Sequence, residues 1–177
     1  MKKIKKEIII FLLFITSLVV YGYTMSILPK EENEVKQEKS TDKAYNFRLK
    51  RIDKDEYIQL SQLYGKPIFI DFWASWCPPC RDAVPYVEKL NKKYGDKIHV
   101  LGLNLDKQES AAEEFLRNED ADYIQLKADE NAAEKYKIKG IPVFYILDEH
   151  GRVVNKYVGF RTSRYEEWVD VINSLLK

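Results

Sequence analysis

The spacing of apolar residues predicts alternating strands and helices along most of the chain. Short continuous apolar runs are typical of strands that are buried on both faces. Helices are indicated where apolar residues recur at intervals of three and four positions. The runs that predict strands are 46–52, 67–73, 98–105, 123–126, 143–147 and 153–158. The runs that predict helices are 57–64, 81–94, 110–118, 131–136 and a last one that begins at Ser163.

Residues at the ends of these runs sharpen the prediction. Ser110 with Glu113, and Ser163 with Glu166, have the spacing of a capping box at a helix start. The segment 148–151 between the last two strands contains Gly151 and predicts a hairpin turn. Strands interleaved with helices, then a hairpin and a final helix, predict an α/β sandwich with a mixed central sheet flanked by helices.

Residues 1–43 follow a different pattern. Four lysines, at positions 2, 3, 5 and 6, precede an apolar stretch over 8–28 that contains no charged residue. A stretch of about 21 residues is long enough to cross a bilayer as a helix, and lysines before it predict that the N-terminus stays in the cytoplasm. We therefore expect a transmembrane signal anchor over 1–28, with a cleaved signal peptide as the alternative.

The expected domain organisation follows from this division. The segment 29–43 is charged and polar, which predicts a flexible linker. The globular domain is expected to span 44–177 and to lie outside the cytoplasm, attached to the cell membrane by a single span. Disulfides can persist in that compartment.

Composition narrows the function classes. The 177 residues carry a formal net charge of +1, which gives no indication of a nucleic-acid partner. The two cysteines of the chain are Cys77 and Cys80, separated by two prolines. Because no third cysteine competes for pairing, the two can cycle between dithiol and disulfide and so carry two electrons.

The neighbouring segments favour redox chemistry at this pair. The strand predicted over 67–73 leads into Cys77 and a predicted helix follows it, so Cys77 lies at a helix start, where the dipole favours a thiolate. The thiolate is the attacking species in disulfide exchange.

Other uses of the two cysteines fit less well. A structural zinc site needs about four ligands, and His99 and His150 lack ligand-like spacing, so we expect no metal. Covalent haem attachment needs a histidine where Arg81 stands. A purely structural disulfide across so short a loop would remove little chain entropy.

The motifs together resemble the thioredoxin superfamily, and most closely its membrane-anchored, extracytoplasmic TlpA/ResA-type branch. The run Phe72–Arg81 is similar to the active-site segment of the family. Pro85 matches the proline of the active-site helix, and Gly140–Pro142 matches the segment that carries a cis-proline. Gly159 matches a glycine before the final helix, and 106–128 corresponds to the extra helix and strand of this branch.

The resemblance implies a thiol–disulfide oxidoreductase that needs no small-molecule cofactor. Cys77 would be the exposed nucleophile that attacks a partner disulfide, and Cys80 the buried thiol that resolves the mixed disulfide. Asp71 would be a buried acid–base residue for Cys80, with a pKa raised by desolvation. The residues expected to contact the substrate are Trp76, Ile141 and Pro142.

The chain departs from the family pattern at three positions. The TlpA/ResA-type branch usually has a glutamate where this chain has Ala83, and often an asparagine where this chain has Asp71. Thioredoxin has a lysine near its aspartate on the next strand, and the matching position here is Gly102. The expected acid–base group, Asp71, is therefore the one found in thioredoxin, but the lysine that accompanies it there is missing.

Partners follow from the resemblance alone. Substrates would be disulfides or thiols of exported proteins, apocytochrome c before haem attachment among them, and a membrane thiol-transfer protein would supply electrons. We expect a monomer that acts as a reductant. The alternatives are an oxidase that forms disulfides in exported proteins and a non-catalytic binding module. The charged face of 106–128 is either a docking surface or simply solvated.

Overall fold

The computed structural model describes residues 42–177, in which seven strands and four α-helices form one α/β domain. The strands are β1 (Arg48–Lys50), β2 (Tyr57–Gln59), β3 (Ile68–Trp73), β4 (His99–Asn104), β5 (Ile124–Lys127), β6 (Val143–Leu147) and β7 (Val153–Val158). The α-helices are α2 (Pro78–Tyr94), α3 (Glu109–Asn118), α4 (Glu130–Lys135) and α5 (Arg164–Leu175), and η1 (Leu60–Leu63) is a 3₁₀ helix.

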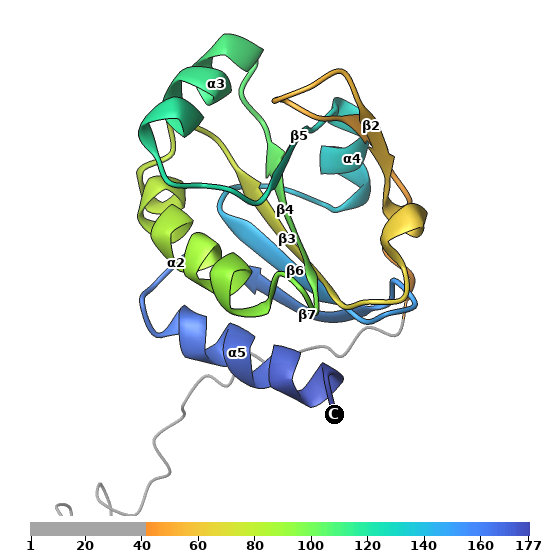
Figure 1. Ribbon diagram of the computed structural model, residues 1–177. Coiled ribbons are helices and arrows are strands. Elements are labelled where there is room, and N and C mark those ends of the chain that lie inside the picture. The colour runs from red at the N-terminus through yellow and green to blue at the C-terminus, as the bar shows by residue number, and fades with distance from the viewer. Residues whose placement is uncertain (1–41) are drawn as a thin grey trace, which may run out of the picture. The chain divides into compact units, whose positions relative to one another are not determined.

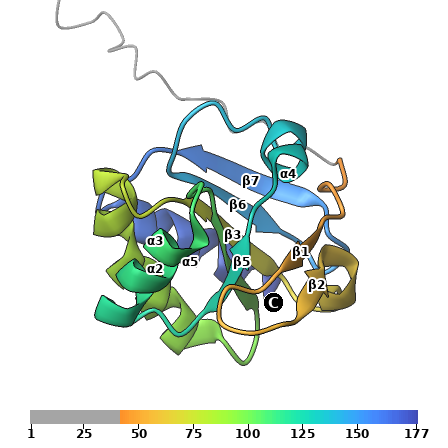
Figure 2. The same cartoon turned by 90° about the horizontal axis from the view of Figure 1, so that it is seen from above.

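The central sheet is mixed, as predicted. Its strand order is β5-β4-β3-β6-β7. Strands β3, β4 and β5 run parallel to one another, and β6 is antiparallel to both of its neighbours, β3 and β7. Helices α2, α3 and α5 cover one face, and α4 and the β1–β2 hairpin cover the other (Figures 1 and 2). The predicted thioredoxin-like α/β architecture is thus confirmed for the described residues.

One edge of this sheet collects the chain segments that matter for chemistry. The carboxyl ends of β3 and β4 meet there, because Trp73 pairs with Asn104. The start of β6 and the end of β7 reach the same edge, since Val143 pairs with both Phe72 and Val158. We call this the disulfide edge, because the loop after β3 leads to the two cysteines at the start of α2. Carboxyl ends of parallel strands are where ligand sites of α/β sheets are usually found.

Both faces of β3 are buried, which explains its nearly continuous apolar sequence. On the α2 side, Phe69 packs against Trp168, with ring centroids 4.9 Å apart. On the other side, Phe72 packs against Tyr136 at 5.1 Å. Asp71 is the polar exception within this strand, and it is completely buried.

Some sequence predictions of local structure were wrong. The helix predicted over 57–64 is strand β2 followed by η1, because Ile58 pairs with Leu49 across the β1–β2 hairpin. Neither predicted capping box forms: Ser110 lies inside the first turn of α3, after the N-cap Gln108. Ser163 has helical backbone angles, φ −64° and ψ −15°, and makes no capping hydrogen bond.

The start of the described chain is part of the domain. The amide of Val153 donates to the carbonyl of Asp42 at 3.0 Å, and that of Ala44 donates to Gly151 at 2.9 Å. The predicted anchor over 1–28 lies outside the described residues. Within 42–177, no helix has the length and apolar character to cross a membrane.

Gly151, in the turn between β6 and β7, is expected to be essential for stability. Its φ is +76°, and a Cβ there would lie 2.4 Å from the ring of Tyr64. The left-handed conformation costs about 1–2 kcal/mol, and overpacking costs about 1–3 kcal/mol. Gly151→Ala should therefore lower the free energy of unfolding by about 2–5 kcal/mol in denaturant titrations.

Gly65 provides a matched control. It also has a positive φ, +104°, but a Cβ there would meet no atom within 4 Å. Gly65→Ala should lose only the backbone contribution. Equal losses for the two variants would show that Tyr64 contributes nothing to the requirement for glycine.

Candidate active site

The loop after β3 places both cysteines at the start of α2. The helix begins at Pro78 with Cys77 as its N-cap residue, three positions before the predicted start at Arg81. Prolines suit the first turn because the N–H groups there have no helical partner and the proline φ is already close to helical. The prediction that Cys77 lies at a helix start is confirmed.

The two cysteines form a disulfide with a Cα–Cα distance of 5.3 Å. The Sγ atom of Cys77 accepts a hydrogen bond from the amide of Cys80 at 3.3 Å. Once reduced, a Cys77 thiolate would be stabilised by this donor and by the helix dipole. The geometry therefore favours Cys77 as the nucleophile.

The expectation that Cys77 is exposed is wrong for this oxidised form. Cys77 is 3% exposed and Cys80 is 0% exposed. Both pack in an apolar cluster with Ile52, Ala74 and Ala112, which come from three different segments. Cys77 is still the more accessible of the two, which favours Cys77 over Cys80 as the residue that exchanges with a partner.

Asp71 has the environment that the resemblance implied. It is fully buried, and neither carboxyl oxygen has a hydrogen-bond partner among the described residues. Burial raises the pKa of Asp71 well above its usual range. A carboxyl group with a raised pKa is a stronger base when ionised, and so is better able to accept and return a proton.

The structure explains why Asp71 has no lysine across from it. Gly102 is the β4 residue paired with Asp71. A Cβ at Gly102 would lie 2.2 Å from Oε1 of Gln125, which already accepts a hydrogen bond from Nε1 of Trp73 at 3.0 Å. The Gln125 amide thus fills the space in which a longer side chain at position 102 would start.

Ala83, which stands where the TlpA/ResA-type branch usually has a glutamate, has apolar surroundings. Ala83 is fully buried on α2, in a cluster that includes Phe69 and Phe144. A carboxylate placed there would lose its hydration without gaining a cation. Asp71 remains the candidate acid–base group, because it is a completely buried carboxyl group in the strand that leads to the pair.

The residues predicted to contact substrate lie at the disulfide edge. Trp76 is 67% exposed, whereas Trp73 is fully buried, as expected. Ile141 is half-buried and packs against the cluster that holds the cysteines. The Ile141–Pro142 bond is cis, in agreement with the resemblance, but the Pro142 side chain is buried.

Two apolar residues at this edge, Phe115 and Val158, were not predicted from the sequence. Phe115 of α3 packs against the cysteine cluster, with its ring 5.3 Å from Trp73 and the Arg81 guanidinium 5.8 Å above it. The spacing of Ala112, Phe115 and Leu116 indicated a buried helix face, but not what it covers. Val158 is 66% exposed and pairs with the residue after Pro142, a position without any sequence signature.

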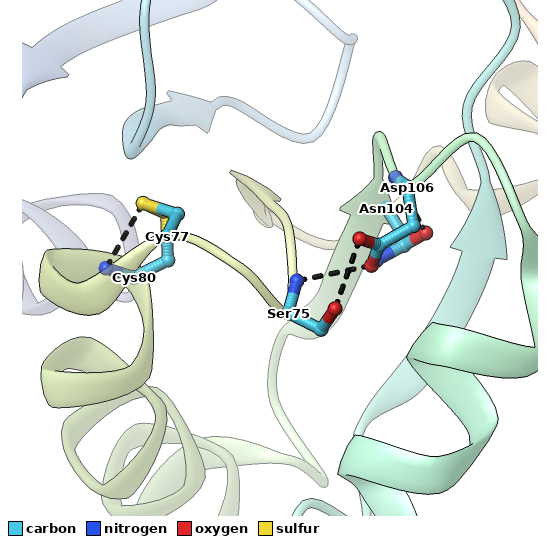
Figure 3. The surroundings of a disulfide bond; sticks show 5 residues. All are labelled: Ser75, Cys77, Cys80, Asn104 and Asp106. Atoms are coloured by element: carbon cyan, nitrogen blue, oxygen red, sulfur yellow. Dashed lines mark hydrogen bonds between the residues drawn. A yellow bond between two sulfur atoms is a disulfide. The ribbon is translucent and has the colours of Figure 1, made fainter.

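A polar network beside the cysteines was also missed. The Asp106 carboxylate accepts hydrogen bonds from the amide and the hydroxyl of Ser75, at 3.0 and 2.9 Å (Figure 3). It also accepts one from Nδ2 of Asn104 at 2.6 Å. A signal was available, because Asn104 ends a buried parallel strand and Asp106 follows it, next to the strand that leads to the cysteines.

One group of carboxylates has the spacing of metal ligands. Glu88, Asp120 and Asp122 bring one oxygen each within 4.8 Å of one another. The Lys92 ammonium lies among them, 3.6 Å from Glu88 and in contact with Asp120. This lysine supplies positive charge to two of the three carboxylates, so the group is described as an ion-pair cluster.

Comparison with known proteins identifies the family. The Redoxin family matches residues 39–171. The chain belongs to the Redoxin family. A related member is the thioredoxin-like protein YneN of Bacillus subtilis (strain 168), 34% identical over 127 residues that cover 70% of this chain and 74% of YneN.

Two further relatives of this Redoxin-family chain have names that state an activity. The thiol-disulfide oxidoreductase ResA of Oceanobacillus iheyensis is 29% identical over 158 residues, covering 86% of this chain and 82% of ResA. A solved structure from Chlorobium tepidum, described as a thiol:disulfide interchange protein DsbE, has a TM-score of 0.74 and 31% identity. The match covers 78% of this chain and 98% of that one.

These findings agree with the geometry of the site. The chain is a ResA-like member of the thioredoxin superfamily and a thiol–disulfide oxidoreductase. The alternative of a non-catalytic binding module is not retained.

Proposed function

We propose that this oxidoreductase uses Cys77 and Cys80 as its redox couple and reduces disulfides of exported proteins. The observation that carries the proposal is the placement of the pair: Cys77 caps α2, and the strand before it holds the buried, unpartnered Asp71. This arrangement supplies a stabilised thiolate and a proton acceptor for a second thiol.

The reaction would proceed in two exchange steps. In the first, the Cys77 thiolate attacks one sulfur of the partner disulfide, forms a mixed disulfide and releases the other sulfur as a thiolate, which takes up a proton. In the second, Cys80 loses its proton to Asp71 and attacks the Cys77 sulfur. The second partner sulfur leaves as a thiolate and takes up a proton, so the partner disulfide has been reduced to two thiols. The two electrons came from Cys77 and Cys80, which are now oxidised to a disulfide.

The surface around the pair would bind an extended partner segment. Exposed Trp76 and Val158 and half-buried Ile141 provide apolar contact at the disulfide edge. Pro142 would help to shape this surface from below, since its side chain is buried. Phe115 of α3, beside the cysteines, would give the segment 106–128 a part in partner recognition.

The proposed location rests on the sequence. Four lysines before the apolar stretch 8–28 favour a single membrane span with the domain outside the cytoplasm. A membrane thiol-transfer protein would then return electrons to the Cys77–Cys80 pair. Reduction of apocytochrome c before haem attachment is one process that would need such an enzyme.

One feature favours a second candidate, an oxidase that forms disulfides. The helix start and the Cys80 amide both stabilise a Cys77 thiolate, and a more stable thiolate makes the reduced form more stable and the couple more oxidising. The direction of electron flow therefore depends on the reduction potential.

The reduction potential of the full chain is expected to be that of a reductant, near or below about −270 mV. It is measured by equilibrating the protein with thiol–disulfide buffers of defined ratio and counting free Cys77 by alkylation. A variant with both cysteines replaced by serine gives the alkylation background. A value close to about −120 mV would overturn the reductant proposal and favour the oxidase.

A further inference from the structure

The polar network beside the cysteines has no place in the exchange steps above. Figure 3 shows Ser75 between the Cys77–Cys80 disulfide and the Asp106 side chain. The two oxygens of Asp106 hold Ser75 at two points, its amide nitrogen and its hydroxyl, at 3.0 and 2.9 Å. The Asp106 amide in turn donates to Oδ1 of Asn104 at 3.0 Å.

Burial makes this contact strong. Asp106 is 3% exposed and Asn104 is 0% exposed. A carboxylate taken out of water is costly unless donors replace the water, and two of the three donors to Asp106 belong to Ser75. Hydrogen bonds to an ionised acceptor are also stronger than those between neutral groups. Asp106 therefore fixes Ser75 firmly to the end of β4.

The fixed residue belongs to the loop that leads into α2. Ser75 is followed directly by exposed Trp76 and by Cys77, the N-cap residue. The Cys77 amide donates to the carbonyl of Ala74 at 3.1 Å, which closes a turn around Ser75. Holding Ser75 at two atoms sets the orientation of this turn, and so the direction of the Trp76 side chain and the position of the Cys77 sulfur.

We propose that Asp106 is a positioning residue for the exchange reaction, acting through Ser75 on Trp76 and Cys77. The Asp106 carboxylate touches neither sulfur nor substrate in this role. It keeps the loop in one conformation, so that the Cys77 sulfur is already oriented for attack when a partner binds. The proposal rests on the oxidoreductase activity but not on the direction of electron flow.

The test compares pre-reduced full-length proteins that carry Asp106→Ala or Ser75→Ala. The second-order rate constant for reduction of insulin disulfides should fall about tenfold in Asp106→Ala, since slight misplacement of reacting groups is costly. Ser75→Ala removes the hydroxyl contact but keeps the hydrogen bond from the backbone amide to Asp106, so a smaller fall of about threefold is expected. Backbone ¹⁵N relaxation should show increased mobility of residues 74–77 in both variants.

Asp148 provides the control for a merely structural role. Its carboxylate also accepts several hydrogen bonds from a loop, at 2.8–3.0 Å, but in the β6–β7 turn at the opposite edge of the sheet. Asp148→Ala should destabilise the protein while leaving the insulin rate and the mobility of 74–77 unchanged. Rates of Ser75→Ala and Asp106→Ala within twofold of the parent, or an equal fall in Asp148→Ala, would overturn the proposal.

The parent protein separates this test from that of the proposed function. If the parent does not reduce insulin, the reductant proposal fails, and the same comparison is made with oxidised protein and a reduced peptide dithiol. The Asp106 proposal predicts the same order of rates there, with Asp106→Ala slower than Ser75→Ala and Ser75→Ala slower than the parent.

Discussion

Cys77→Ser is expected to abolish disulfide reduction, with a loss of more than about a thousandfold, as for removal of other catalytic nucleophiles. Cys80→Ser should behave differently. Cys80 is fully buried and Cys77 keeps slight exposure at the helix start, so the first attack remains possible in the Cys80 variant while resolution does not. Partners should therefore accumulate as mixed disulfides with Cys77.

Two measurements distinguish these outcomes. Insulin reduction gives the loss of turnover, and non-reducing electrophoresis of cells that express each variant gives the trapped complexes. A variant that lacks both cysteines controls for non-covalent association. Trapping by Cys77→Ser instead of Cys80→Ser would reverse the assigned roles. The identity of trapped partners would also separate a reductant of exported proteins from an oxidase.

The central strands were the part of the fold that the sequence predicted best. The predicted bounds of β6 and β7, 143–147 and 153–158, agree with the structure. The runs of β6 and β3 are almost wholly apolar because every residue in them is buried, whereas β7 is only partly buried and was recognised with the help of the turn before it. Asp71 was recognisable in the sequence because it is the one polar residue of β3, and the same apolar surroundings raise its pKa.

Features that depend on distant segments were not predictable in this way. The expected helix over 57–64 failed because pairing of Ile58 with Leu49 outweighs local propensity. Cys77 is buried in a cluster to which Ile52 and Ala112, far away in sequence, also belong. Hydrogen bonds between Asp106 and Ser75 join two loops that become neighbours only when β3 and β4 pair.

The surroundings of Asp71 show how such distant contacts set the chemistry. The sequence indicated that a lysine is absent from position 102, but not what replaces it. In the structure the Gln125 amide, held by Trp73, fills that space. Asp71 is consequently influenced mainly by desolvation, and burial is the cause of its raised pKa. The folded protein therefore binds the Asp71 proton more tightly than the unfolded chain does.

Asp71→Asn is expected to slow the resolving step about a hundredfold, within the range of a lost general base. The first attack should be nearly unchanged, because the Cys77 thiolate depends on the helix start and the Cys80 amide and not on Asp71. Stopped-flow mixing of the reduced protein with a disulfide substrate separates the two phases. Unchanged resolution would show that another group accepts the Cys80 proton.

The same variant also tests the burial of this carboxyl group through stability. Because the folded pKa of Asp71 is raised, the folded state holds its proton more tightly, and stability falls as pH rises from the unfolded pKa, about 3.9, to the folded pKa. Asparagine cannot ionise, so Asp71→Asn should gain over the parent across that range, by about 1.4 kcal/mol for each tenfold difference between the two ionisation constants. Urea titrations from pH 4 upward measure this gap, and a gap that shrinks with pH would contradict a raised pKa. A variant that is more stable and yet resolves slowly cannot owe its slow step to unfolding, so the pair of results would assign the lost rate to the missing proton acceptor.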